Sequence, residues 1–203
     1  MDLWSIEREY ARRGFERICG CDEAGAGPLA GPVYAAAVIL PPETEIEGLN
    51  DSKKLTAKKR ERIFDEIVEK AAAWAVESVS AEDIDGINIL NARMLAMRLA
   101  VEKLEIRPDF LLIDGNCDRG FTMPREMVVG GDGLSANIAA ASILAKVSRD
   151  RRMRELDELY PGYGFGKHMG YGTKAHYEAL DRLGPCPEHR QSFLRKYYAR
   201  REH

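Results

Sequence analysis

Residues 18–32 read ICGCDEAGAGPLAGP, and this stretch decides how the rest of the chain can be arranged. A short apolar run carries two adjacent carboxylates, Asp22 and Glu23, at its end. Like charges a few ångströms apart repel and push one carboxyl group to protonate, so a bound cation would stabilise the pair. The glycines that follow let the backbone approach another group closely and offer it N–H donors. The stretch predicts a metal ion beside a phosphate, with a strand capped by a solvated acidic turn as the alternative.

Apolar runs and helix signals outside this stretch predict an α/β fold. Strands are expected at residues 15–22, 33–40, 74–80, 110–115 and 126–129. Helices are expected at residues 1–14, 56–72, 91–104, 135–159, 173–183 and 186–201, with a turn or short helix at 81–86. Small apolar residues in the first turns of the 135–159 helix imply that it packs closely on a sheet. This order of elements predicts a mixed sheet covered by helices.

Three apolar runs end in acidic side chains. Asp22 and Glu23 end the first run, Asp114 ends a second, and Asp132 follows a third. Ligands of open sheets gather at strand ends, so we expect these side chains to lie close together. A cluster of four carboxylates favours a hard cation, Mg²⁺ or Mn²⁺. Such a site is suited to phosphodiester hydrolysis, in which metal ions activate a water and stabilise the leaving oxygen.

The adjacency of Asp22 and Glu23 raises a question of geometry. Neighbouring residues of a strand point to opposite faces of the sheet. The two can therefore share a metal only if the strand breaks there, or if Glu23 also contributes its backbone carbonyl. The glycines that follow favour such a break.

Composition bounds the class of protein. A chain of 203 residues, 45% hydrophobic and 31% charged, is typical of one soluble globular domain, and we expect residues 1–203 to form a single catalytic domain. The four cysteines lack zinc or disulfide spacing and indicate reduced thiols in a cytoplasmic protein. The sequence shows neither a bilayer-spanning apolar run nor a signal peptide. The net charge is −3, but residues 146–203 hold 13 Lys and Arg against 8 Asp and Glu, which is compatible with a basic flank that grips phosphate.

Six segments of the chain carry a resemblance to a known family. They read CDEAGAGPLAGPV, DSKKL, LLIDGN, GDGLSANIAAASILAKVSRDR, YGFGKHMGYGTKAH and HRQSF. In this order they resemble the segments of type 2 ribonuclease H, or ribonuclease HII, from about residue 18 to residue 193. The resemblance implies a ribonuclease-H-like mixed sheet flanked by helices, with a basic C-terminal helical extension at about residues 160–203 that binds substrate. It also implies an endonuclease dependent on Mg²⁺ or Mn²⁺, which hydrolyses the RNA strand of RNA–DNA hybrids and nicks 5′ of ribonucleotides embedded in duplex DNA.

Matched position by position, the family's catalytic metal ligands fall on the acids that the strand ends select. These are Asp22, Glu23, Asp114 and Asp132. The resemblance places substrate contacts on the loop and on three further residues. These are Gly25, Ala26, Gly27, Lys53, Lys54 and Tyr171. Tyr171 matches the family tyrosine that stacks on the sugar at an RNA–DNA junction.

The residues alone leave other roles open for several of these positions. Tyr171 could instead pack on the last helices, and the pair Lys53 and Lys54 could simply be solvated. Asp150 is expected as a buried ion-pair partner rather than a ligand. The histidines of the matching segments, at positions 168, 176 and 189, are expected to be structural or to lie on the substrate side.

The chain also departs from the family pattern. The family's GRG loop has Ala26 in place of arginine, and its lysines before the Gly-Asp pair and before the Gly-Tyr pair are replaced by Gly130 and Met169. Three cations that would face nucleic acid are absent, and Lys146 and Lys167 are the nearby candidates to compensate. Each lost phosphate contact weakens binding, whereas the loop backbone that senses the ribose 2′-OH is kept. We therefore expect a competent metal centre with a weakened grip on its substrate.

Two alternatives stay open. A hybrid-binding protein with little activity is disfavoured because all four acids are present and the cations are what is missing. An engineered variant of altered specificity or stability would make the substitutions deliberate. A nucleotide-binding loop is excluded, because GAGPLAG lacks the lysine and hydroxyl of a phosphate-binding P-loop. We expect a cytoplasmic monomer whose partners are RNA–DNA hybrids and ribonucleotide-containing duplex DNA, without membrane association.

Overall fold

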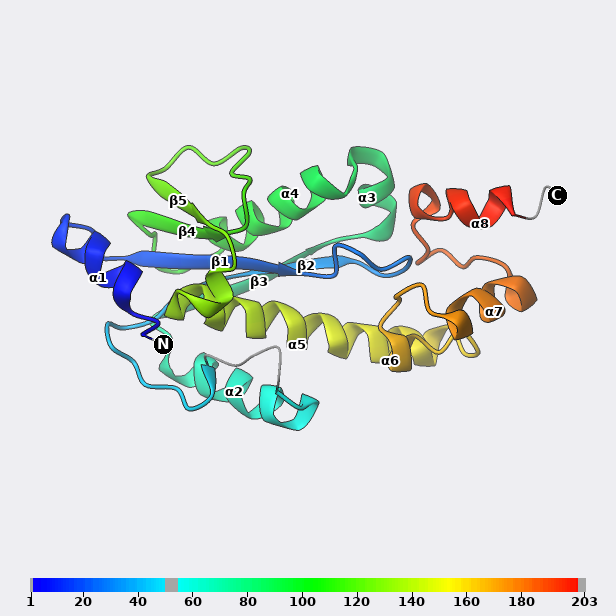
Figure 1. Ribbon diagram of the computed structural model, residues 1–203, viewed down its shortest axis with the longest axis horizontal. Coiled ribbons are helices and arrows are strands. Elements are labelled where there is room, and N and C mark those ends of the chain that lie inside the picture. The colour runs from blue at the N-terminus through cyan, green and yellow to red at the C-terminus, as the bar shows by residue number, and fades with distance from the viewer. Residues whose placement is uncertain (1, 50–54, 201–203) are drawn as a thin grey trace.

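The computed structural model describes residues 2–49 and 55–200, in which a mixed sheet lies between two layers of helices (Figure 1). The strands are β1 (Ile18–Ala24), β2 (Val33–Ile39), β3 (Ala73–Val79), β4 (Phe110–Asp114) and β5 (Arg125–Val128). Their order across the sheet is β3-β2-β1-β4-β5. β1 is antiparallel to β2 and β2 to β3, whereas β4 runs parallel to β1 and β5 parallel to β4. The predicted mixed α/β sheet is confirmed.

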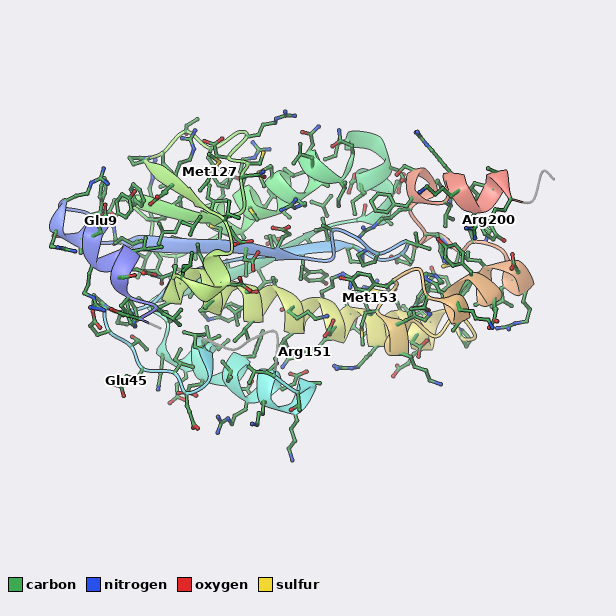
Figure 2. The ribbon with its side chains drawn as sticks, viewed as in Figure 1. Glu9, Glu45, Met127, Arg151, Met153 and Arg200 are labelled. Atoms are coloured by element: carbon green, nitrogen blue, oxygen red, sulfur yellow. The ribbon has the colours of Figure 1, made fainter. Side chains whose placement is uncertain are left out.

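Helices cover both faces of the sheet. α4 (Ile89–Glu102) lies on one face with α3 (Ala81–Ile87) beside it, and α5 (Ala136–Leu159) crosses the other face (Figure 1). α2 (Ala57–Lys70) packs outside α5, where Figure 2 shows Arg151 between the two helices. The remaining elements are α1 (Ser5–Arg12), η2 (Gly131–Gly133), α6 (Phe165–His168), α7 (Lys174–Leu183), η3 (Gln191–Phe193) and α8 (Arg195–Ala199). None of the described helices is both long and apolar enough to cross a lipid bilayer.

Side-chain caps set the start of three predicted helices. Thr56, Ser135 and Thr173 each accept a hydrogen bond from the backbone N–H three residues further on. This satisfies one of the N–H groups that the first turn of a helix leaves without a partner. The helices α2, α5 and α7 therefore begin where the sequence predicts, and α7 ends at Gly184 as expected.

α5 is pressed against the centre of the sheet. A Cβ atom at Gly20 of β1 would lie 2.2 Å from the carbonyl carbon of Asn137, so only glycine fits at this crossing. The amide oxygen of Asn137 also accepts the backbone N–H of Leu40 at 2.7 Å. The small residues in the first turns of α5 allow this close approach, as the sequence predicts. Asp22 follows Gly20 by two positions on β1, so this crossing holds α5 beside Asp22.

The predicted helix at residues 186–201 is wrong. Residues 186–190 are not helical, and only the short α8 follows the single turn η3. The backbone here pairs with the loop between β1 and β2: His189 forms a bridge with Ala30, and the N–H of Arg190 donates to the carbonyl of Leu29 at 2.9 Å. These tertiary hydrogen bonds take the place of helical ones.

The C-terminal segment encloses an apolar cluster of its own. Its buried members are Leu29, Ala30, Met153, Leu156, Tyr163, Phe165, Ala179, Leu180, Cys186, Leu194 and Tyr197. Two of them come from the β1–β2 loop, and Met153 comes from α5 at the junction between the sheet and the C-terminal helices (Figure 2). The cluster fixes the C-terminal helices to the loop that follows the acid pair.

Candidate metal centre and its groove

Asp22 and Asp114 lie side by side at the ends of the two central parallel strands. Cys21 of β1 pairs with Ile113 of β4, and the next residue on each strand is the aspartate. Asp22 is only 6% exposed. The Oδ1 atom of Asp114 accepts the backbone N–H of Gly131, at the start of η2, at 2.7 Å. The parallel register thus produces the gathering of acids that the strand ends predict.

Electrostatic crowding marks this edge of the sheet. Burial raises the pKa of Asp22 well above its usual value, the charges of Glu23 and Asp114 raise it further, and the Ser142 hydroxyl acts in the opposite direction. Burial also raises the pKa of Glu23; Arg93 opposes this rise and Asp114 adds to it. A carboxylate held near others in a poorly solvated site favours the arrival of a cation.

The strand does not break after Asp22, so that expectation is wrong. β1 continues to Ala24, which pairs with Tyr34 of β2, and this ladder keeps the backbone extended through Glu23. As a result, Asp22 points toward Ser142 of α5, whereas Glu23 points to the opposite face and forms an ion pair with Arg93 of α4. The other route, in which Glu23 also uses its backbone carbonyl, stays open.

Asp132 lies next to this centre in η2, on the half-buried turn that Gly131 ties to Asp114. Within residues 2–49 and 55–200, no three His, Cys, Asp or Glu side chains already form a set that could hold a metal ion. The donors nevertheless fit a hard divalent cation. Besides the crowded carboxylates, the Oε2 atom of Glu23 is buried and has no hydrogen-bond partner among the described residues.

A groove of about 460 Å³ opens beside the acids. Its wall combines Glu23, the loop 25–27, Tyr171 and three basic side chains, Arg60, Lys146 and Arg149. The structure therefore brings together the predicted loop, the predicted tyrosine and one of the predicted acids. The predicted contacts at positions 53 and 54, both lysines, lie outside the described residues.

The fold requires glycine at position 25 of the loop but not at position 27. Gly25 has a φ of +98°, and a Cβ there would lie 2.0 Å from the Nε atom of Arg149, so the fold itself requires glycine. At Gly27 the φ is not positive, and a Cβ would only touch the Tyr171 ring at 3.6 Å. Packing therefore does not demand glycine at position 27, because a Cβ there would make only an ordinary contact with Tyr171.

Two buried arginines, which the sequence reasoning did not identify as a support for the loop, hold its backbone. Arg190 donates to the carbonyls of Gly25, Ala26 and Gly31 at 2.7 to 3.1 Å. Arg149 donates to three further carbonyls, at residues 30, 32 and 169. Burial lowers the pKa of both guanidinium groups, that of Arg190 to about 9 with Arg149 contributing, so both stay charged at neutral pH. All but one of these contacts join residues more than 100 positions apart, and such contacts leave no local sequence pattern.

The three positions where the family cations are missing have different surroundings. Ala26 lines the groove. Gly130 has a φ of +70° with open space where a Cβ would be, so a lysine there would be strained rather than excluded. Met169 packs against the C-terminal apolar cluster. Of the two candidate replacements, Lys146 lines the groove, whereas Lys167 is exposed on α6 and does not line it.

Asp150 is an ion-pair partner, as expected. Its side chain is 9% exposed and contacts Lys146 at 2.7 Å and Arg60 at 4.0 Å. Since this carboxylate pairs with two of the basic side chains of the groove wall, it positions both of them. Arg60, which comes from α2, was not singled out from the sequence.

The histidines form a buried hydrogen-bonded chain behind Tyr171. His189 accepts the N–H of Cys186 on Nδ1 at 2.9 Å, so its Nε2–H donates to Nε2 of His176 at 3.0 Å. His176 then donates from Nδ1 to the carbonyl of Tyr171, also at 3.0 Å. Burial lowers the pKa of both histidines to about 4, so both are neutral at neutral pH. The role of His176 and His189 is therefore structural, which is one of the two roles expected for them.

Solved structures place the fold in a known class. The chain superposes on the ribonuclease H2 of Pyrococcus horikoshii with a TM-score of 0.74 and 26% identity, covering 91% of this chain and 98% of that one. It superposes on the ribonuclease HII of Archaeoglobus fulgidus, solved in complex with PCNA, with a TM-score of 0.71 and 25% identity, covering 87% and 94%. The fold and the crowded carboxylates define a nuclease of the ribonuclease-H-like class.

Sequence relatives narrow the class to one family. The ribonuclease HII of Desulfitobacterium hafniense (strain Y51) is 56% identical over 92% of this chain and 72% of its own length. That of Idiomarina loihiensis is 57% identical over 87% of this chain and 94% of its own. The profile of the ribonuclease HII family matches residues 19–200, and the chain belongs to this family. It is an endoribonuclease that acts on RNA–DNA hybrids and depends on a divalent metal ion.

Proposed function

We propose that four acids bind Mg²⁺ or Mn²⁺ and form the catalytic centre of this nuclease. They are Asp22, Glu23, Asp114 and Asp132. The observation that carries the proposal is the adjacency of Asp22 and Asp114 at the ends of β1 and β4, where the mutual charge of the acids opposes their ionisation. Divalent ions bound there would supply an activated water and stabilise the leaving oxygen of the phosphodiester.

The chain's own residues orient these acids before any ion arrives. The backbone N–H of Glu23 donates to Oδ1 of Asp22 at 2.7 Å, and the N–H of Gly131 donates to Oδ1 of Asp114 at the same distance. A backbone donor thus holds each aspartate, and part of the ordering cost of ligand binding is already met in the fold.

Ribose recognition belongs, in this proposal, to the loop 25–27 and Tyr171. The carbonyls of Gly25 and Ala26 accept from Arg190, and the N–H groups of Ala26 and Gly27 have no backbone partner among the described residues. Free N–H donors beside an aromatic ring suit a ribose 2′-OH next to a stacked sugar. We therefore propose that the enzyme nicks 5′ of ribonucleotides embedded in duplex DNA as well as cutting hybrids.

The grip on phosphate is proposed to be weaker than in relatives that carry GRG. Ala26 offers no charge to the groove. The basic residues that line it are Arg60, Lys146 and Arg149, with Lys53 and Lys54 added by resemblance. The C-terminal residues, from about 160 to 203, complete a single catalytic domain as its substrate-binding extension. The enzyme is proposed to act as a monomer in the cytoplasm.

Cleavage of two labelled duplexes tests this function. One carries a single ribonucleotide in DNA and the other a continuous RNA–DNA hybrid, each with Mg²⁺ and separately with Mn²⁺. We expect both to be cut, the first on the 5′ side of the ribonucleotide. Cutting of the hybrid alone would contradict the proposed junction recognition, and cutting of neither by the folded protein would favour the alternative of a hybrid-binding protein.

Restoring a cation in the loop should strengthen the grip. In Ala26→Arg, a guanidinium would face the groove. One more phosphate contact makes the fall of log K with log salt steeper by about one unit, so hybrid binding should tighten by about threefold more between 200 and 50 mM salt than it does in the wild type. Fluorescence anisotropy without divalent ions measures this, with Ala26→Gln as the uncharged control of similar length. An unchanged affinity and slope in the arginine variant would show that the loop does not approach phosphate.

A further inference from the structure

Arg93 is a cation inside the candidate metal centre that the proposed function does not use. It lies in the first turns of α4 and forms an ion pair with the carboxylate of Glu23, on the face of the sheet opposite Ser142. The side chains are 27% and 11% exposed, so the pair is largely removed from water. Charges in such a site interact more strongly than the same charges on the surface.

The pair is incomplete. The Oε2 atom of Glu23 and the Nε atom of Arg93 are both buried, and neither has a hydrogen-bond partner in the part of the chain that the structure describes. A guanidinium and a carboxylate frequently pair through two parallel hydrogen bonds, and a buried polar atom without a partner costs free energy. A buried carboxylate oxygen without a partner is an open ligand position for a hard cation.

We propose that Arg93 is the internal counter-ion of the metal centre, so that divalent metal binding at Glu23 is an exchange of one cation for another. The proposal rests on the ligand role of Glu23 in the proposed function. Without a divalent ion, Arg93 neutralises one of the crowded acids and holds the Glu23 carboxylate toward α4. When a divalent ion binds, it competes with Arg93 for the same carboxylate.

If this exchange occurs, removing the positive charge of Arg93 has two opposite consequences. Its metal-free form is less stable, because three carboxylates then repel without compensation. Its affinity for a divalent ion is higher, since no guanidinium repels the ion or holds the ligand away. At an effective dielectric of about 20, removing one charge several ångströms from a divalent site corresponds to about a tenfold or greater gain in affinity.

Calorimetric titration of Mn²⁺ and Mg²⁺ into the metal-free protein measures this directly. Glutamine and methionine are both compatible with a helix. In Arg93→Gln and Arg93→Met we expect the Kd for Mn²⁺ to fall about tenfold. We also expect a lower melting temperature in EDTA and a larger increase in melting temperature when Mg²⁺ is added. Arg119→Gln is the matched control. Arg119 is an exposed arginine that bonds Asn91 and forms no ion pair with an acid of the described residues, so the metal affinity of this variant should stay that of the wild type.

Each outcome decides the matter. Variants that fold only with a divalent ion support the exchange, because the ion then replaces Arg93. Unchanged or weaker metal binding in both variants overturns it, as does failure to fold with and without metal, which would make Arg93 purely structural. Titration of Asp22→Asn separates the two proposals. If this variant binds the metal ion as tightly as the wild type, the proposed metal centre is wrong. If binding depends on Asp22 but is unchanged in the Arg93 variants, only the counter-ion role of Arg93 is wrong.

Discussion

Asp22→Asn is expected to abolish cleavage of an RNA–DNA hybrid, lowering kcat about 10³-fold or more, while making the metal-free protein more stable. The loss follows because a metal ligand supplies several kcal/mol of charge stabilisation in the transition state. Asn has the same shape and keeps an oxygen for the N–H of Glu23, which donates to Asp22 at 2.7 Å. Single-turnover cleavage measures the first effect, and thermal unfolding in EDTA measures the second.

The expected gain in stability has a definite sign. The pKa of Asp22 is raised in the folded protein by burial and by the charges of Glu23 and Asp114, so the folded state binds its proton more tightly than the unfolded state. The metal-free protein therefore loses stability as pH rises through that raised pKa, and a neutral amide removes this loss. Asp114→Asn should behave similarly, because Asp114 is part of the same crowded group.

Asp150→Asn provides the contrasting control. Its carboxylate is also buried, but it pairs with Lys146 and Arg60 and lies outside the crowded group. We expect this variant to be less stable and to keep its stabilisation by Mg²⁺, whereas Asp22→Asn gains stability and loses that response. A fully active Asp22→Asn, or one destabilised as strongly as Asp150→Asn, would contradict the proposed metal centre.

The strand-end acids show how far the sequence reaches toward this centre. The apolar runs before Asp22 and Asp114 predict strands, and the parallel pairing of Cys21 with Ile113 brings the two acids together as expected. The backbone at Glu23 was harder to predict, because the glycines that follow it suggest a break in the strand. The break is absent since β2 supplies a paired partner through Ala24, and pairing across a sheet overrides a local tendency to turn.

Residues that act across long sequence distances could not be found from the sequence. The ion pair of Arg93 with Glu23 joins α4 to β1, and Arg190 reaches a loop more than 150 residues earlier. Residues 186–201 are basic and helix-like in sequence, so they predict a helix. An arginine on such a helix is expected to be exposed. Only the tertiary contact with the β1–β2 loop shows that the guanidinium of Arg190 is buried.

Arg190→Met is expected to lower the free energy of unfolding by about 3–5 kcal/mol, the largest stability effect anticipated for this chain. The side chain of Arg190 is fully buried, and its guanidinium satisfies the carbonyls of Gly25, Ala26 and Gly31 together. Methionine fills a similar volume but leaves these acceptors without donors. For a domain of this size the loss corresponds to a fall in melting temperature of about 10 °C. Urea denaturation and calorimetry measure it.

Two further variants separate the hydrogen bonds from the charge. Arg190→Lys keeps a cation, but a single ammonium cannot reproduce the planar fork that reaches three carbonyls, so we expect an intermediate loss. Arg195→Met removes an exposed arginine of α8 and should change stability by less than about 0.5 kcal/mol. If Arg190→Met were as stable as Arg195→Met, the fork would not be what holds the loop.

The same variants connect the buried fork to substrate recognition. Freed carbonyls would turn toward water, and the backbone of Gly25 and Ala26 would lose the geometry that directs its N–H groups into the groove. Arg190→Lys, the milder change, should therefore raise KM for a duplex with one ribonucleotide more than KM for a continuous hybrid, because a junction offers fewer 2′-OH groups to a loosened loop. An equal rise for both substrates would mean that Arg190 supports the fold as a whole and has no selective hold on the ribose-sensing loop.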